Sequence, residues 1–201
     1  MSGPMVPLVN FNDLTGWKII GNAPNAWSVA NGVLECANQR ALCMLATERS
    51  DFKDFYLRLE TMLAEGRAGG ISYRLTTRGA EEASYRVLIP SVNQMDRSSA
   101  VGELQFTPNF GTGGNAVTVL QKSNSAVNVN PNEWFTVEIV AAANEFMVFV
   151  NDNQVVDFRD DGERLLSGGV GILCRANTKV RVRNVEIKEI RGSVSGSSDR
   201  K

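Results

Sequence analysis

Hydrophobic and polar residues alternate with a period of two along much of the chain. The clearest case is residues 52–61, where Phe55, Leu57 and Leu59 alternate with polar side chains or tyrosine. Successive side chains of a β-strand point to opposite faces of its sheet, so this pattern predicts a strand with one buried face. Three further segments show the same alternation: residues 71–75, 84–89 and 102–106.

Other segments are predicted strands because they are rich in β-branched and aromatic residues or are bounded by turn signals. They are residues 27–29, 33–37, 42–47, 134–140, 145–150, 154–158, 180–183 and 185–188. Asn31-Gly32 is a strong signal for a two-residue hairpin, and residues 151–153 separate another pair of strands. A β-bulge is expected at Arg183–Asn184. Residues 159–166 are the one segment that could form a short helix.

About a dozen short strands without intervening helices predict an all-β fold, either a sandwich or a barrel. Residues 9–190 would form this domain. Residues 1–8 are predicted to be an arm along the domain or along a partner, and the polar residues 191–201 a flexible tail.

Charge and composition exclude several functions. Lys and Arg together number 21, Asp and Glu 22, and the net charge is −1, so no basic surface for nucleic acid or anionic membrane is expected. The chain has no histidine, which removes the commonest general base and metal ligand. No transmembrane segment or signal peptide is recognised, so the expected location is the cytoplasm, or the periplasm or exterior if a leader has been removed.

Three cysteines, Cys36, Cys43 and Cys174, suit a reducing compartment and, without histidine, do not predict a zinc site. If residues 33–37 and 42–47 form a hairpin closed by residues 38–41, Cys36 lies directly opposite Cys43. Either a cross-strand disulfide or two buried thiols would then be compatible with the sequence.

Few side chains are candidates for catalysis, and no cofactor is predicted. The glycine-rich residues 110–115 lack the Lys-Ser/Thr pair of a phosphate loop and are expected to be a loop between strands. Paired carboxylates remain the possible route to hydrolysis, and Glu103 and Glu60 are weak candidates because each lies on the polar side of a strand. Asp160-Asp161 is expected to be a solvated turn.

Several segments together resemble the 3-keto-disaccharide hydrolase family, in order and in spacing. They are residues 11–17, 27–34, 47–60, 70–74, 133–134, 150–151 and 182–188, so the resemblance spans roughly residues 9–190. It implies an antiparallel two-sheet β-sandwich of the concanavalin-like jelly-roll type, with a sugar site on the concave sheet.

The chain departs from the family where chemistry would be expected. The family usually has Glu, Gln and Asp where this chain has Arg86, Leu88 and Ser91, and Gln and His where it has Leu173 and Arg175. Arginine stays protonated and cannot act as a base. The resemblance therefore suggests that an ancestral hydrolytic site has been lost.

Strand alternation assigns a set of residues to that concave face: Ser72, Arg74, Arg86, Leu88, Glu103, Gln105, Leu173 and Arg175. Tyr73, Tyr85, Val87, Leu104 and Ile172 are assigned to the core.

Three hypotheses follow. The first is a non-catalytic module that docks on a larger protein assembly as an accessory or structural subunit, since exposed leucine and arginine suit an interface. The others are a carbohydrate-binding module and a divergent 3-keto-glycoside hydrolase.

Overall fold

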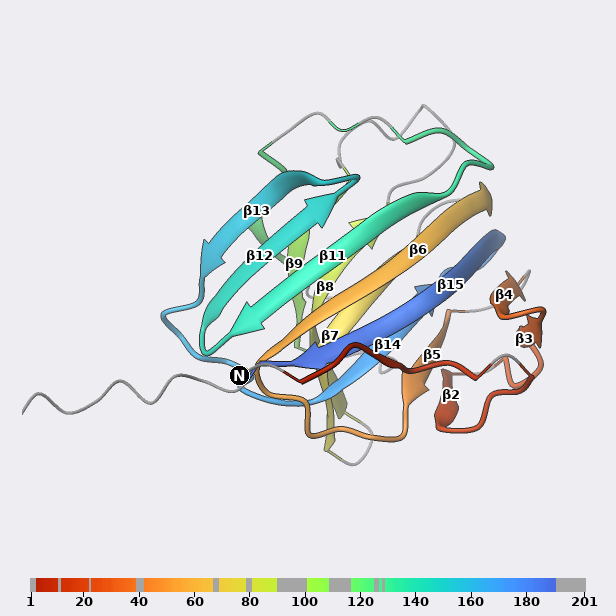
Figure 1. Cartoon of the computed structure of the whole chain (residues 1–201), viewed down its shortest axis with the longest axis horizontal. Coiled ribbons are helices and arrows are strands. Elements are labelled where there is room, and N and C mark those ends of the chain that lie inside the picture. The colour runs from red at the N-terminus through yellow and green to blue at the C-terminus, as the bar shows by residue number, and fades with distance from the viewer. Residues whose placement is uncertain are drawn as a thin grey trace, which may run out of the picture.

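The computed structural model describes residues 3–10, 12–21, 23–38, 42–66, 69–78, 81–89, 101–108, 117–124, 127 and 129–190. These residues form fifteen strands and no helix. The strands build two antiparallel sheets that pack face to face, one in front of the other in Figure 1. The predicted all-β sandwich is confirmed.

The first sheet has eight strands. Seven of them follow one another in the order β13-β12-β11-β6-β15-β4-β3, and the eighth, β1, pairs with β15. Their bounds are β1 Val6–Pro7, β3 Trp27–Ala30, β4 Val33–Asn38, β6 Phe55–Glu65, β11 Phe135–Ala142, β12 Glu145–Val150, β13 Asn153–Arg159 and β15 Thr178–Glu189.

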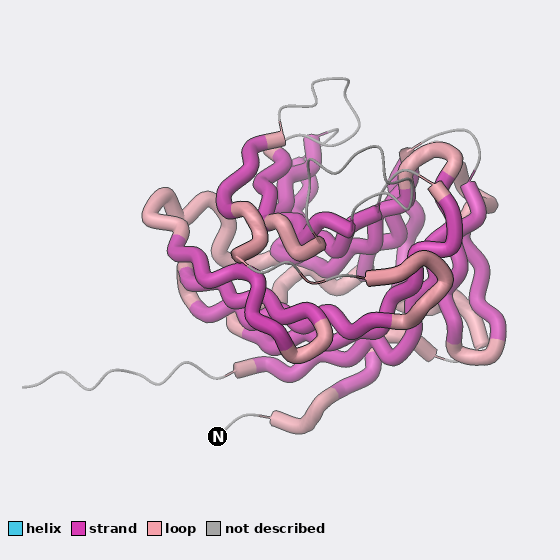
Figure 2. The backbone as a smooth tube through the Cα atoms, turned by 90° about the horizontal axis from the view of Figure 1, so that it is seen from above, coloured by secondary structure: helices cyan, strands magenta, loops and turns pink. Residues whose placement is uncertain are grey.

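The second sheet has seven strands in the order β10-β9-β8-β7-β14-β5-β2. Their bounds are β2 Trp17–Gly21, β5 Cys43–Thr47, β7 Gly69–Arg78, β8 Glu81–Ile89, β9 Leu104–Thr107, β10 Thr118–Gln121 and β14 Gly169–Cys174. Figure 2 shows the two layers from above.

The main core lies between the sheets and takes alternate residues from each strand. Leu57 and Leu59 of β6 meet Tyr73 of β7 and Tyr85 of β8, and the two tyrosine rings stack with centroids 5.5 Å apart. The predicted core residues Val87, Leu104 and Ile172 also lie here. Period-two alternation therefore assigned the inner side of the second sheet correctly.

Several predicted turns are confirmed by their backbone. Asn31 and Gly32 both have positive φ (51° and 74°) between β3 and β4, as a tight hairpin requires. Asn151 and Asp152 have φ of 47° and 63° between β12 and β13. The bulge at Arg183–Asn184 is present as a register shift between Arg183 and Glu186 in the pairing of β15 with β6.

The predicted hairpin of residues 33–37 with 42–47 is wrong. Strand β4 pairs with β3 and β15 in the first sheet, whereas β5 pairs with β2 and β14 in the second. The chain crosses from one sheet to the other between them. Cys36 and Cys43 therefore meet across the core and not across a ladder, and neither is in a disulfide. Residues 39–41 of the proposed turn lie outside the described residues.

The possible helix at residues 159–166 is also wrong, and so is the expected solvation of Asp160. Strand β13 continues to Arg159, and the buried carboxylate of Asp160 then accepts hydrogen bonds from the backbone N–H of Gly162 and of Arg164. The hydroxyl of Tyr85 and the guanidinium of Arg164 also donate to it. These bonds hold a compact loop in place of a helix.

Part of the predicted arm runs along the first sheet. Val6 and Pro7 pair with Ile187 and Glu186 of β15, and the N–H of Leu8 donates to the carbonyl of Val185. The predicted tail at residues 191–201 and the glycine-rich residues 110–115 lie outside the described residues. Among the residues that are described, there is no apolar helix of membrane-spanning length.

Candidate functional site

Polar side chains gather on the outer side of β7, β8 and β9, the side of the second sheet that faces away from the first. Their strand neighbours Tyr73, Tyr85 and Leu104 point into the core, so the intervening residues must point outward. We call this set the polar face, and it consists of Ser72, Ser84, Arg86, Glu103, Gln105 and Thr107.

The register of the strands brings these residues side by side. Arg86 lies directly opposite Ser72 on one side and Gln105 on the other, and Ser84 lies opposite Thr107. The Nε–H of Arg86 donates to Oγ of Ser72 at 3.4 Å, and the amide Nε2 of Gln105 donates to the carboxylate of Glu103 at 2.7 Å. Four of the six polar residues are thus linked in pairs.

Two side-chain oxygen atoms of the polar face accept no hydrogen bond from any described residue. Oε1 of Gln105 and Oγ1 of Thr107 are buried and have no hydrogen-bond partner among the residues that the structure describes. The two residues are 7% and 4% exposed. A buried polar atom without a partner costs about 1–3 kcal/mol, so such atoms are unusual unless a ligand or water completes them.

Burial also lowers the pKa of Arg86. Removal from water, and secondly the positive charge of Arg175, lower the pKa of Arg86 from 12.5 to about 10. The stem of Arg86 lies over Gly70, where a Cβ would come within 2.8 Å of its Cδ. Glycine at position 70 therefore makes room for the arginine to lie along the sheet.

A small apolar cluster adjoins the polar face on the same side of the sheet. Leu88 and Leu173 lie on either side of Gly70, one on β8 and the other on β14. Leu173 packs with Met44, Ala46 and Leu75 in a cluster separate from the main core. Both leucines are buried, so they form part of the folded chain and not an exposed patch.

Arg74 does not share this face, although alternation assigned it there. Its φ is +48°, and the pairing of β7 with β8 shifts register between Tyr73 and Thr76. This bulge turns the side chain inward, where its guanidinium lies over the ring of Phe146 of the first sheet. Alternation cannot anticipate a bulge, because one extra residue reverses the faces that follow.

The remaining predicted residues lie in two places. Arg175 is exposed just beyond the end of β14, on the rim of the second sheet. Glu60 lies on β6 of the other sheet, where the guanidinium of Arg183 and the amide of Asn184 donate to its carboxylate. Burial alone would raise the pKa of Glu60, but these donors lower it. The structure therefore does not bring Glu60 to Glu103.

Ser84 and Thr107 were missed by the sequence analysis although they carry the same signal as the residues it found. Each lies two positions from a residue assigned to the face, Arg86 and Gln105 respectively. A complete application of period two would have included both.

Two clefts of about 530 and 540 Å³ lie away from the polar face. The first is lined by residues 163–167 with Phe106 and Pro108, and the second lies around Phe52 and Ile187 beneath the N-terminal segment. None of the six polar-face residues lines either cleft, so the clefts are separate from the site described here.

Comparisons with known proteins agree with the architecture. The family model described as a 3-keto-alpha-glucoside-1,2-lyase-like domain matches residues 4–188. No curated protein matches the sequence.

Three solved structures have similar folds. A candidate glycosyl hydrolase from Parabacteroides distasonis superposes with a TM-score of 0.67 at 16% identity, covering 93% of this chain and 94% of that one. The carbohydrate-binding module CBM66 from Bacillus subtilis gives 0.62 at 16%, covering 87% and 96%. A Bacillus subtilis protein of unknown function with a galectin-like fold gives 0.68 at 10%, covering 94% and 96%. At these identities the likeness supports the jelly-roll fold.

Proposed function

Because this chain belongs to the family of 3-keto-α-glucoside-1,2-lyase-like domains, we propose that it is a carbohydrate-binding module whose ligand contacts the polar face. The observation that carries this proposal is that two buried oxygen atoms, Oε1 of Gln105 and Oγ1 of Thr107, have no hydrogen-bond partner in the described part of the chain. A sugar presents several hydroxyl groups on one small ring, and each can donate and accept a hydrogen bond. Hydroxyls placed beside these oxygens would remove the cost of leaving them unsatisfied.

We infer that a sugar would approach the polar face from the edge of the second sheet. Val119 of the edge strand β10 lies directly opposite Gln105, so the two side chains share a face. Val119 is 46% exposed, whereas Gln105 is buried. A sugar entering at β10 would meet the apolar side chain of Val119 first and the amide of Gln105 next, a mixture typical of small-ligand sites.

The charged groups favour binding over hydrolysis. Arg86 occupies the centre of the polar face, where the family usually has a carboxylate, and a guanidinium donates hydrogen bonds but cannot remove a proton. The fold of CBM66, a carbohydrate-binding module, is consistent with such a role.

The docking hypothesis loses its main support. It depended on leucine side chains being available to a partner, and Leu88 and Leu173 are buried within the chain itself. The similar folds include a carbohydrate-binding module, and none of the three is described as an accessory subunit.

Binding can be tested with a glycan array followed by calorimetry on the best ligand. We expect Gln105→Leu to weaken binding about tenfold, because a sugar hydroxyl left without its acceptor in a buried site costs about 1–3 kcal/mol. Gln154→Leu, an exposed position on the first sheet, is the matched control and should bind normally. Equal binding by the two variants, or no binding of any glycan by the folded wild-type protein, would contradict the proposal.

Hydrolysis of 3-keto-glucosides is the second candidate, favoured by the family and by the buried carboxylate of Glu103. Loss of a positioned acid or base typically reduces a rate by about 10²–10⁴-fold. Turnover by the wild type that falls by this factor in Glu103→Gln, with substrate binding retained, would establish it. Absence of turnover on any 3-keto-glycoside would leave binding as the function.

A further inference from the structure

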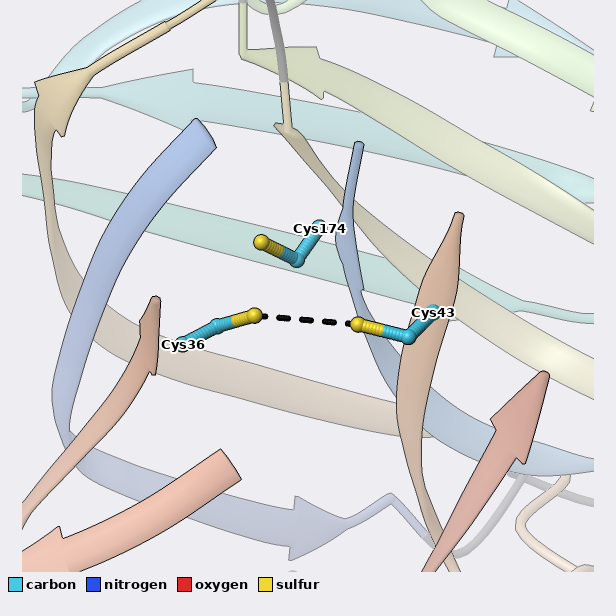
Figure 3. Close-up of side chains that lie close together, drawn as sticks. All are labelled: Cys36, Cys43 and Cys174. Carbon is cyan, nitrogen blue, oxygen red and sulfur yellow. Dashed lines mark hydrogen bonds between the residues drawn. The ribbon is translucent and has the colours of Figure 1, made fainter. Parts of the chain in front are cut away.

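Three cysteine thiols lie close together in the core (Figure 3). The Sγ atoms of Cys36 and Cys43 are 3.7 Å apart, and those of Cys36, Cys43 and Cys174 all lie within 4.8 Å of one another. All three residues are fully buried and none is in a disulfide. We call them the thiol cluster.

The topology of the fold places these sulfurs together from both sheets. Cys43 of β5 and Cys174 of β14 are directly opposite each other in the register of the second sheet. Cys36 of β4 reaches them from the first sheet, across the core (Figure 3). The cluster therefore joins the two layers, and nothing in the polar-face proposal uses it.

The spacing of the sulfurs suits a three-coordinate metal ion. A metal bound to sulfur at about 2.3 Å in a planar trigonal arrangement holds its sulfurs about 4 Å apart. The Cys36–Cys43 separation of 3.7 Å is close to this value and the other two separations are at most 4.8 Å, so coordination would require shifts of less than about 1 Å.

The donor set selects the kind of ion. Thiolate sulfur is a soft ligand that favours monovalent copper, zinc and iron–sulfur clusters. A structural zinc site almost always has four ligands, and no histidine or carboxylate joins the three sulfurs among the residues that the structure describes. Monovalent copper is the soft ion of this group that accepts three sulfur ligands without a fourth.

We propose that Cys36, Cys43 and Cys174 form a buried three-sulfur site for a single monovalent copper ion. Binding forms three Cu–S bonds and releases the thiol protons to solvent, and no electron is transferred. Because the thiols are fully buried, the ion enters as the chain folds or during transient opening of the sandwich.

The test is to refold the full chain anaerobically with one equivalent of copper(I) held by a competing chelator. We expect one copper to be retained per chain, X-ray absorption to show three sulfur ligands at about 2.3 Å, and the unfolding midpoint to rise. Loss of an outer-shell partner of a metal ligand typically weakens metal binding by about 10–100-fold, and loss of a ligand itself costs more. Each single Cys→Ala variant should therefore bind copper at least about 100-fold more weakly.

Controls separate this site from methionine sulfur and from disulfide formation. The triple Cys→Ala variant keeps all the methionines, so copper retained by it would overturn the proposal. Retention of no copper by the refolded wild type would do the same, as would a spectrum with two sulfur ligands. Circular dichroism identifies variants that fail to fold. If the variants do not fold, the number of sulfur ligands measured in the wild type decides whether the proposal holds. Thiol titration after refolding should give three reduced cysteines in the copper-free protein; a disulfide there would also contradict the proposal.

Discussion

The guanidinium of Arg74 joins three separate loops at one end of the sandwich. Its Nη1 donates to the carbonyls of Ala143 and Leu165 at 2.6 and 2.9 Å, and its Nη2 to the carbonyl of Lys53 at 3.0 Å. Asp54 lies 3.5 Å from the same Nη2, and Arg74 has no exposed surface. Although burial lowers its pKa, the group keeps its charge at neutral pH and is paired on every side.

We therefore expect Arg74→Met to destabilise the fold by about 3–5 kcal/mol, the cost of breaking a buried charged network by removing one partner. Arg74→Lys should recover only part of this loss, because an ammonium group lacks the planar fork that reaches several carbonyls at once. Arg159→Met removes an exposed arginine with two ion pairs and is the control, with an expected change below about 1 kcal/mol. Urea unfolding measures all three variants, and a similar loss for Arg74→Met and Arg159→Met would show that Arg74 has no special role.

The elements of this fold were predictable where their signals are local. Alternation and turn residues identified strands such as β6, β8 and β9 and the hairpin at Asn31-Gly32, because a strand's period and a turn's φ depend only on adjacent residues. The pairing of residues 33–37 with 42–47 was wrong because a hairpin and a crossing between sheets have similar sequence patterns. The polar face was found in part for the same reason: period two gave Ser72, Arg86, Glu103 and Gln105. The bulge in β7 placed Arg74 on the other face.

The bulge in β15 is an element whose backbone can be tested. Asn184 has φ of +51° at the register shift, a conformation that asparagine and glycine tolerate and β-branched residues do not. We expect Asn184→Val to destabilise the protein by about 1–3 kcal/mol. Asn184→Gly loses the hydrogen bond from Nδ2 to Glu60 but keeps the backbone, so its unfolding free energy should change by less than half as much. Equal losses would mean that the side-chain bond, and not the bulge, stabilises this strand.

At the scale of the whole molecule, the absence of histidine determines how stability depends on pH. Burial would raise the pKa of the Asp160 carboxyl, but hydrogen bonds from Tyr85 and Arg164 outweigh it and hold that pKa below its ordinary 3.8. A hydrogen bond from Arg181 likewise holds the pKa of Glu35 below its ordinary 4.5. A lowered pKa in the folded state contributes stability that is present above the ordinary value and is lost as pH falls through the folded one. Stability should therefore decline only below about pH 5 on the acid side.

The alkaline limit comes from groups with the opposite shift. Hydrogen bonds to Cys174 and Cys43, together with burial, raise the pKa of the Cys36 thiol above 9.0, and burial raises that of Tyr56 from 10.0 to about 12. Such groups ionise more readily in the unfolded chain, so stability is complete below the unfolded pKa and falls as pH rises beyond about 9. Between these limits none of the described groups with a perturbed pKa is expected to titrate. The thermal midpoint from calorimetry should accordingly be flat from about pH 6 to about 8. A steep slope inside that range would contradict this expectation, and Cys36→Ala would show whether the Cys36 thiol causes it.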